Sequence, residues 1–309
     1  MLQFNLLKFG YTPLKKLVIF GVGLIGGSVA LALKSNKATL ALKKAGSNTH
    51  IVGVGRNQAS LNVALTLGVI DKAESNIAVA LKDADVLLIA APVAQTSSIL
   101  QSIKPYLNSN TVITDAGSTK GNVLVAAQAI LGEQFSQFVG GHPIAGAEKS
   151  GVSAAKNDLF MGKNVVLTPT PETNRDAVLA VSNLWQACGA NVSEMPAETH
   201  DSIFAAVSHL PHLLAFALVD DIASRPNAEQ LFSFAASGFR DFTRIAGSHP
   251  EMWRDISLAN KTALLSEIDA FENELAQLKQ LLTNEDGTGL QALFERASVA
   301  RNNWAESKK

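Results

Sequence analysis

The sequence predicts an α/β domain with a doubly wound, mainly parallel sheet, followed by an all-α domain. Across residues 16–170, short β-branched runs alternate with helix-like stretches, which is the pattern of βαβ units. After Pro171 the β-branched runs nearly vanish, and alanine- and leucine-rich segments replace them. The 309 residues, 47% of them hydrophobic, are enough for two cores. We therefore expect a sheet domain at residues 1–171 and a helical domain at residues 172–309.

Six runs are the expected strands: 17–23, 51–55, 85–92, 111–117, 138–141 and 164–169. The apolar run at 86–91 is typical of a strand that is covered on both faces. Helices are expected near 173–188, 197–224, 228–246, 249–283 and 287–305. In the fourth helix, apolar residues recur every three or four positions, at Leu264, Ile268, Phe271, Leu275, Leu278 and Leu282. This seam must pack on the chain's own helices or on a second subunit, and the apolar segment 203–219 favours a homodimer.

Composition and charge exclude several classes of protein. The formal net charge is −1 with the signs interspersed, so we expect neither nucleic-acid binding nor attachment to an anionic membrane. The apolar segment 203–219 contains two histidines and a proline and is marginal in length for a bilayer, so we expect a helix buried on all sides. The single cysteine, Cys188, suits a reducing compartment, and we expect a cytoplasmic protein.

A glycine motif follows the first expected strand and opens a helix. It consists of Gly21, Val22, Gly23, Leu24, Ile25 and Gly26, a G-x-G-x-x-G pattern. Gly21 permits the tight turn, Gly23 lets the backbone approach a pyrophosphate, and Gly26 allows close packing of helix on strand. In this context the motif predicts a dinucleotide-binding, Rossmann-type domain.

The next strand ends without the acidic residue that binds the adenosine ribose of NAD. Gly55-Arg56-Asn57 stands there instead, and an arginine in place of a carboxylate favours NADP over NAD. Alternatively, Arg56 is a solvated cation in a loop. Ala91 and Pro92 end the strand expected at 85–92, where they would contact the nicotinamide half of the cofactor or form an ordinary turn.

A serine and a histidine follow the next two strands. Ser118 lies in the segment 115–121 and His142 in the segment 140–146, so both are expected at the carboxyl edge of the sheet, where ligands bind. His142 is suited to accept a proton from a substrate hydroxyl, with Ser118 sharing the hydrogen bond. The alternative is a structural histidine that caps a Gly-Pro turn.

A third polar cluster lies in the helical part. His200 precedes His209 and His212, which are three residues apart and share one helical face, as a zinc site would require. The sequence places no third ligand nearby, so we expect no metal. A substrate pocket is the favoured interpretation, with Arg244 able to hold a carboxylate through two hydrogen bonds.

These motifs, in their order, resemble the prephenate and arogenate dehydrogenases over nearly the whole chain. The matching segments are GVGLIGGS, DAGSTKG, GHPIAGAEKSG, HD, SHLPH and GFRDFTRIA. The resemblance implies a Rossmann domain, a helical dimerisation domain and a step of tyrosine biosynthesis. That step is oxidative decarboxylation of prephenate to 4-hydroxyphenylpyruvate or of arogenate to tyrosine, with NAD or NADP as hydride acceptor.

The resemblance also implies roles for individual residues. His142 corresponds to the catalytic histidine at the ring hydroxyl, and Ser118 to its partner. The substrate-binding positions are His200, His209, His212, Arg244 and Trp253, with Glu148 as a gating acid near the arginine. Competing functions are a 3-hydroxyacid dehydrogenase, an imine reductase and a dinucleotide-sensing regulator. The regulator would not need Ser118, His142 and Arg244 together.

Overall fold

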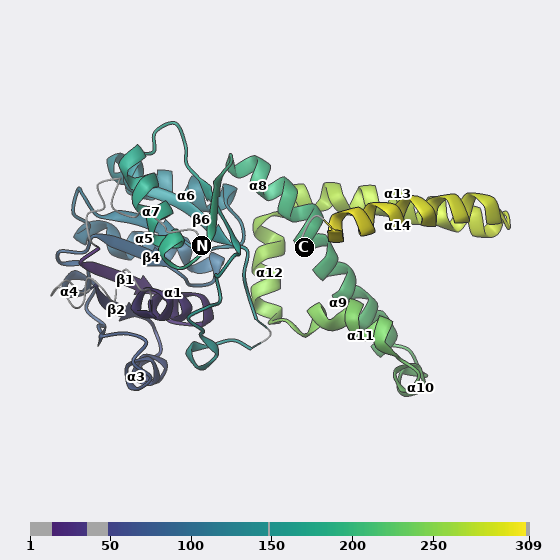
Figure 1. Cartoon of the computed structure of the whole chain (residues 1–309), viewed down its shortest axis with the longest axis horizontal. Helices are drawn as coiled ribbons and strands as arrows, with labels where there is room; N and C mark the ends of the chain where they lie inside the picture. The colour runs from purple at the N-terminus through teal and green to yellow at the C-terminus, as the bar shows by residue number, and fades with distance from the viewer. Residues whose placement is uncertain (1–13, 36–48, 148, 307–309) are drawn as a thin grey trace. The chain divides into compact units, whose positions relative to one another are not determined.

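A computed structural model describes residues 14–35, 49–147 and 149–306 of the chain (Figure 1). It divides into two compact units, Met1–Asn260 and Lys261–Lys309. The boundary after Pro171 stays a prediction.

The first unit is built on a sheet of eight strands in the order β3-β2-β1-β4-β5-β6-β7-β8. Strands β1 to β6 pair in parallel, β7 is antiparallel to β6, and β8 is parallel to β7. The strands are β1 Lys16–Phe20, β2 His50–Val54, β3 Lys72–Ala73, β4 Val86–Ile89, β5 Val112–Asp115, β6 Phe138–Pro143, β7 Asn164–Thr168 and β8 Asn191–Glu194. The predicted doubly wound, mainly parallel sheet is confirmed.

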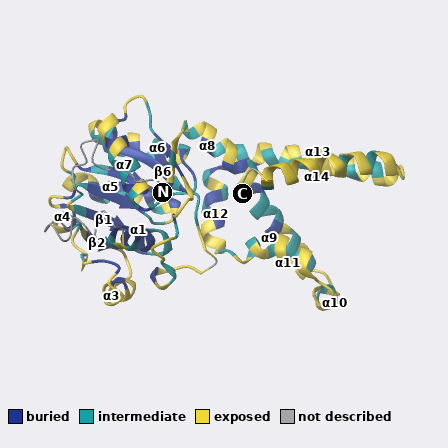
Figure 2. Ribbon diagram, in the orientation of Figure 1, coloured by how far each residue is buried: buried dark blue, intermediate teal, exposed yellow. Residues whose placement is uncertain are grey.

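Helices cover both faces of this sheet because its strands are apolar on both sides. In β1, Leu17 and Ile19 face one core, while Val18 and Phe20 face the other, as the two-residue period of a strand requires. The first core also contains side chains of α1 (Leu24–Ser35), α3 (Gln58–Thr66) and α7 (Arg175–Ala187). Helices α4 (Ile77–Leu81), α5 (Thr96–Ile103) and α6 (Gly121–Leu131) contribute to the second. Figure 2 shows the resulting buried layers.

A long helical stretch, Ala197–Ala223, leaves the sheet after β8. It comprises α8 (Ala197–Phe204), a π-helical turn (Ala205–His209) and α9 (Leu210–Ala223). By length and composition alone it could cross a membrane, as many core helices could. The expectation that segment 203–219 is buried on all sides is wrong for the single chain, because much of α9 is half-buried and Val207 is exposed.

Two of the expected helices are interrupted. The segment 228–246 forms α10 (Ala228–Ser233) and α11 (Ser237–Thr243), followed by a short 3-10 turn, Arg244–Gly247. The segment 249–283 divides at Asn260 into α12 (Pro250–Ala259) and α13 (Lys261–Thr283). The break occurs because Asn260 leaves the helical backbone conformation and its buried side chain forms hydrogen bonds elsewhere. The second unit consists of α13 and α14 (Gly287–Glu306), which pack as a helical hairpin (Figure 1).

Candidate active site

The glycine turn between β1 and α1 is compact on one side and open on the other. Gly21 has a φ of +92°, and a Cβ there would lie 2.7 Å from the carbonyl oxygen of Ala90. A Cβ on Gly26 would collide with the carbonyl of Gly21 and with Ile19, so the helix packs tightly on the strand. A Cβ on Gly23 would meet nothing within 4 Å. The turn therefore fits a dinucleotide, whose pyrophosphate would approach the backbone at Gly23 and the N-terminus of α1.

The other predicted cofactor residues lie at the ends of neighbouring strands. Ala91 and Pro92 follow β4, and the Ala90–Ala91 peptide lies directly against Gly21. Arg56 is exposed after β2, which pairs with β1. The side chain of Asn57, the next residue, caps α3 by accepting a hydrogen bond from the backbone N–H of Ser60 at 3.1 Å. Arg56 therefore lies between β2 and α3, and β2 is the neighbour of β1, the strand that leads into the glycine turn.

A buried ion pair anchors the ends of β5 and β6. Lys120 and Asp115 are almost fully buried and form a short salt bridge. Lys120 Nζ also donates to the carbonyl of Gly141 at 2.8 Å, and Asp115 accepts from the backbone N–H of Gly141 at 3.0 Å. These bonds fix the backbone that carries the next residue, His142. Ser118 is half-buried in the loop between Asp115 and Lys120, so it follows the strand adjacent to His142.

His142 projects from β6 against the side chains of α8. Its Nδ1 lies 2.8 Å from Nε2 of His200, and Nδ1 of His200 lies 2.8 Å from Oδ1 of Asp201. Asp201 in turn accepts backbone hydrogen bonds from Lys120 and Gly121 at the start of α6, at 2.8 and 2.7 Å. The ring of Phe204 packs edge-on against His142, with centroids 4.8 Å apart. The sheet edge and the first helix of the helical part are therefore joined through His142.

A second aromatic cluster lies along the same helical stretch and α12. His212 stacks on Trp253 with ring centroids 3.6 Å apart, and His209 meets Trp253 edge-on at 6.1 Å. Asn260 Nδ2 donates to Nδ1 of His209 at 3.0 Å. Within the described part of the chain, Nε2 of His209 and Nε1 of Trp253 are buried without a hydrogen-bond partner. The oxygen atoms of an acidic ligand could accept hydrogen bonds from these two neighbouring donors.

Burial lowers the pKa of the histidines in both clusters, which favours their neutral forms at pH 7. It lowers the pKa of His142 well below its usual value, with additional contributions from His200 and Lys120. Burial likewise lowers the pKa of His200, although Asp201 opposes the shift, and lowers that of His209 to about 4. A neutral His142 can accept a proton at pH 7.

The remaining predicted site residues are placed as follows. Arg244 is exposed at the start of the 3-10 turn after α11, close enough to His212 for its charge to help lower the pKa of that histidine, after burial itself. Glu148 lies outside the described residues. The structure thus brings His142 to His200, and His209, His212 and Arg244 to one region.

Sequence reasoning missed four contributors: Asp115, Lys120, Phe204 and Asn260. The only sequence feature that points to Lys120 is its place in the segment DAGSTKG. Nothing in the residues around Asn260 indicates that its side chain is buried and hydrogen-bonded. Among the described residues, no group of three or more histidine, cysteine, aspartate or glutamate side chains is arranged to hold a metal ion.

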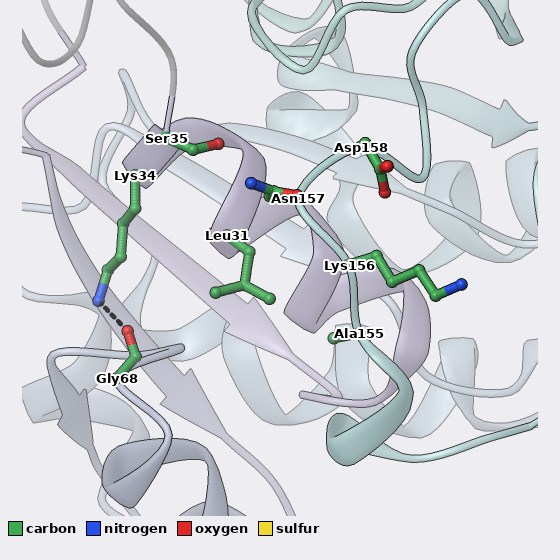
Figure 3. Close-up of a pocket in the computed structure, with 8 residues that line it drawn as sticks. All are labelled: Leu31, Lys34, Ser35, Gly68, Ala155, Lys156, Asn157 and Asp158. Carbon is green, nitrogen blue, oxygen red and sulfur yellow. Dashed lines mark hydrogen bonds between the residues drawn. The ribbon is translucent and has the colours of Figure 1, made fainter.

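One surface pocket lies apart from these clusters (Figure 3). Leu31, Lys34 and Ser35, near the C-terminal end of α1, form part of its wall, together with Gly68 and residues 155–158. Lys34 already donates to the carbonyl of Gly68 at 2.8 Å and pairs with Asp71. None of the predicted site residues lines this pocket.

Two models of one protein family match successive parts of the chain. Residues 38–194 match the family model "Prephenate dehydrogenase, nucleotide-binding domain", and residues 196–296 match "Prephenate dehydrogenase, dimerization domain". The chain belongs to the prephenate dehydrogenase family. Prephenate dehydrogenase of Bacillus subtilis is 38% identical over 93% of this chain and 75% of its own length.

Solved structures of the prephenate dehydrogenase family have the same fold. The enzyme from Aquifex aeolicus, in complex with hydroxyphenyl propionate and NAD+, is 38% identical with a TM-score of 0.85, over 95% of this chain and 99% of that one. Arogenate dehydrogenase of Synechocystis is 27% identical with a TM-score of 0.77, over 94% and 99%. The predicted enzyme class, a nicotinamide-dependent dehydrogenase acting on a prephenate-type acid, is confirmed.

Proposed function

We propose that this chain converts prephenate to 4-hydroxyphenylpyruvate and carbon dioxide, with transfer of a hydride to a nicotinamide cofactor. The observation that carries this proposal is the contact of His142, at the carboxyl edge of a dinucleotide-type sheet, with His200. The helical stretch of His200 also carries His209, whose Nε2, like Nε1 of Trp253, is buried without a partner among the described residues. A base at one end and acid-binding donors at the other suit a small molecule that carries a hydroxyl and carboxylates.

His142 is the proposed base. Its Nε2 takes the proton of the ring hydroxyl, and Ser118 shares the hydrogen bond to that oxygen. A bound nicotinamide supplies the acceptor for the hydride that leaves the carbinol carbon. The bond to the ring carboxylate then breaks, carbon dioxide leaves, and the electron pair aromatises the ring to a phenolate that takes up a proton. Since aromatisation drives this step, the protein mainly has to position and polarise the substrate.

The acid groups of the substrate are assigned to the second cluster. His209 Nε2 and Trp253 Nε1 are buried and have no hydrogen-bond acceptor among the described residues. His212 is stacked on Trp253, and Arg244 supplies a positive charge beside it. We assign carboxylate binding to Arg244 because a guanidinium can form two parallel hydrogen bonds with a carboxylate. A gating role for Glu148 stays a prediction.

NADP is the proposed cofactor in preference to NAD. The segment after β2 offers Arg56 and no carboxylate within Gly55-Arg56-Asn57, and the side chain of Asn57 is occupied in capping α3. A guanidinium favours the 2′-phosphate of NADP, whereas the ribose hydroxyl of NAD is usually bound by a carboxylate. The Aquifex aeolicus relative was solved in complex with NAD+, so kinetics of this chain with both cofactors test the role of Arg56 directly.

A homodimer is the proposed assembly, formed through the helical part. Large apolar side chains are exposed on α13 and α14, among them Leu275, Leu282, Phe294 and Trp304. Exposed apolar side chains on helices of a matched dimerisation domain are suited to cover one another in a second copy. We also propose a cytoplasmic location, where the buried thiol of Cys188 would stay reduced.

Absorbance of the reduced nicotinamide tests substrate and cofactor together. Purified protein is offered prephenate, arogenate and a 3-hydroxyacid, each with NAD and with NADP. We expect the largest kcat/KM for prephenate with NADP, and we expect Arg56→Gln to raise the KM for NADP about tenfold while that for NAD changes little. Turnover of the 3-hydroxyacid alone would overturn the proposed function. Equal preference for both cofactors in the wild type would overturn only the role of Arg56.

A further inference from the structure

We propose that Asp201, acting through His200, is a positioning residue that keeps the proton of His142 on Nδ1 and so leaves Nε2 free to act as the base. This inference deepens the proposed function and rests on the role of His142 in it. Hydrogen bonds connect the backbone at the start of α6 to Asp201, Asp201 to His200 within α8, and His200 to His142 of β6.

Asp201 begins the chain of hydrogen bonds as a carboxylate. It accepts from the backbone N–H groups of Lys120 and Gly121, which are among the unpaired donors at the start of α6, and from Nδ1 of His200. Burial alone would raise the pKa of Asp201, but the hydrogen bonds from His200 and the two backbone groups hold it below its usual value. An ionised carboxylate can only accept hydrogen bonds.

His200 must therefore carry its proton on Nδ1. Its side chain is fully buried, and burial lowers its pKa, so it is neutral at pH 7 with a lone pair on Nε2. That Nε2 lies 2.8 Å from Nδ1 of His142. Since His200 can only accept at this contact, Nδ1 of His142 must donate.

The tautomer of His142 follows from this contact. A neutral imidazole has one N–H, and the contact with His200 places it on Nδ1, so Nε2 holds the lone pair. When Nε2 takes the substrate's proton, the Nδ1 proton can move to Nε2 of His200, and the positive charge then lies next to the carboxylate of Asp201. No proton is gained or lost in this shift, and both histidines return to neutral when the proton leaves.

The groups around His142 and His200 favour a positive charge on His200 over one on His142. Burial, His200, Lys120 and His209 all lower the pKa of His142. Burial and Lys120 also lower the pKa of His200, but Asp201 and Asp115 oppose that shift. The carboxylate of Asp115 is already paired with Lys120. The carboxylate of Asp201, by contrast, is hydrogen-bonded to His200, so it can stabilise a positive charge on the two histidines.

Two substitutions at His200 separate hydrogen bonding from packing. In His200→Gln, the amide can donate to Asp201 and accept from His142, which imitates the required tautomer. In His200→Phe, the ring fills similar space without either bond. We expect kcat to fall about 100-fold or more in His200→Phe and by less than about tenfold in His200→Gln. A role limited to packing predicts the opposite order, and that order would overturn the proposal.

Nitrogen-15 NMR of labelled histidine in the full-length protein, without substrate, reads the tautomer directly. We expect the His142 signals to show Nδ1–H in the wild type and a shift toward Nε2–H in Asp201→Asn. A wild-type His142 protonated on Nε2 would contradict the proposal. This readout separates the two claims, because it holds even if prephenate is not the substrate. Glu198→Gln removes an exposed charge from the same helix, α8, and should leave kcat unchanged.

Discussion

Asn260 holds Nδ1 of His209 as a hydrogen-bond acceptor, with its Nδ2 at 3.0 Å. The second hydrogen of the same amide goes to the carbonyl of Asp201, at 2.7 Å. Because His209 is neutral and accepts at Nδ1, its proton lies on Nε2, the atom left without a partner among the described residues. The residue that ends α12 therefore determines which nitrogen of His209 is available to donate to an acid.

Replacing Asn260 by leucine should weaken substrate binding, because the proton of His209 is then free to move to Nδ1. We expect the KM for prephenate to rise about tenfold, while the dissociation constant of the cofactor changes little. Steady-state kinetics and cofactor titration measure the two quantities. Asn227→Leu, at an exposed asparagine of the same unit, is the matched control. An unchanged KM in a folded Asn260→Leu protein would refute this role.

Arg244→Gln tests the carboxylate site. Loss of a charged, two-point contact should raise the KM for prephenate by about 10- to 100-fold and change kcat much less. The comparison uses Arg225→Gln, which removes an exposed arginine paired with Asp221 at the end of α9. A fall confined to kcat would place Arg244 outside the binding step.

Stability should decrease as the pH falls below about 6.5. The pKa values of His142, His200, His209 and His212 are lowered by burial, so the unfolded chain binds protons that the folded chain does not. The stability that these neutral histidines allow is therefore complete above about pH 6.5, and it is lost as the pH falls toward the pKa values of the folded state, about 4 for His209. For His209 alone, a shift of the pKa to about 4 costs on the order of 1–2 kcal/mol at pH 5.

The midpoint of urea unfolding at pH 7.5 and at pH 5 measures this loss. We expect a lower midpoint at pH 5, and a smaller difference between the two pH values in His209→Gln. Substitution of the exposed His249 by glutamine should leave the difference unchanged. A midpoint that does not change between the two pH values would contradict the burial of neutral histidines.

Much of the sheet could be predicted because its signals are local. Each of the six predicted runs overlaps a strand, since apolar runs and the glycine turn depend on neighbouring residues alone. The two missed strands have little local signal. β3 contains only Lys72 and Ala73, and β8 has the sequence Asn-Val-Ser-Glu, with a single apolar residue. Both are strands because a neighbouring strand pairs with them.

The site was predictable by residue type more than by contact. His142, His200, His209 and His212 were all chosen from the sequence, yet their partners come from distant segments. His142 meets His200 across 58 residues, and Asn260 meets His209 across 51. No periodicity connects such pairs. The break at Asn260 was missed for the same reason, because the side chain of Asn260 bonds to Asp201 and His209, which are distant in the sequence.

In the proposed reaction, His142 is the base that accepts the hydroxyl proton while a hydride leaves the cyclohexadienyl acid. The most direct test is the turnover number of His142→Asn with saturating prephenate, followed by absorbance of the reduced nicotinamide, together with cofactor binding by fluorescence titration. We predict a fall in kcat of at least about 100-fold with a cofactor dissociation constant within about threefold of the wild type. A variant that turns over prephenate at the wild-type rate would contradict the claim.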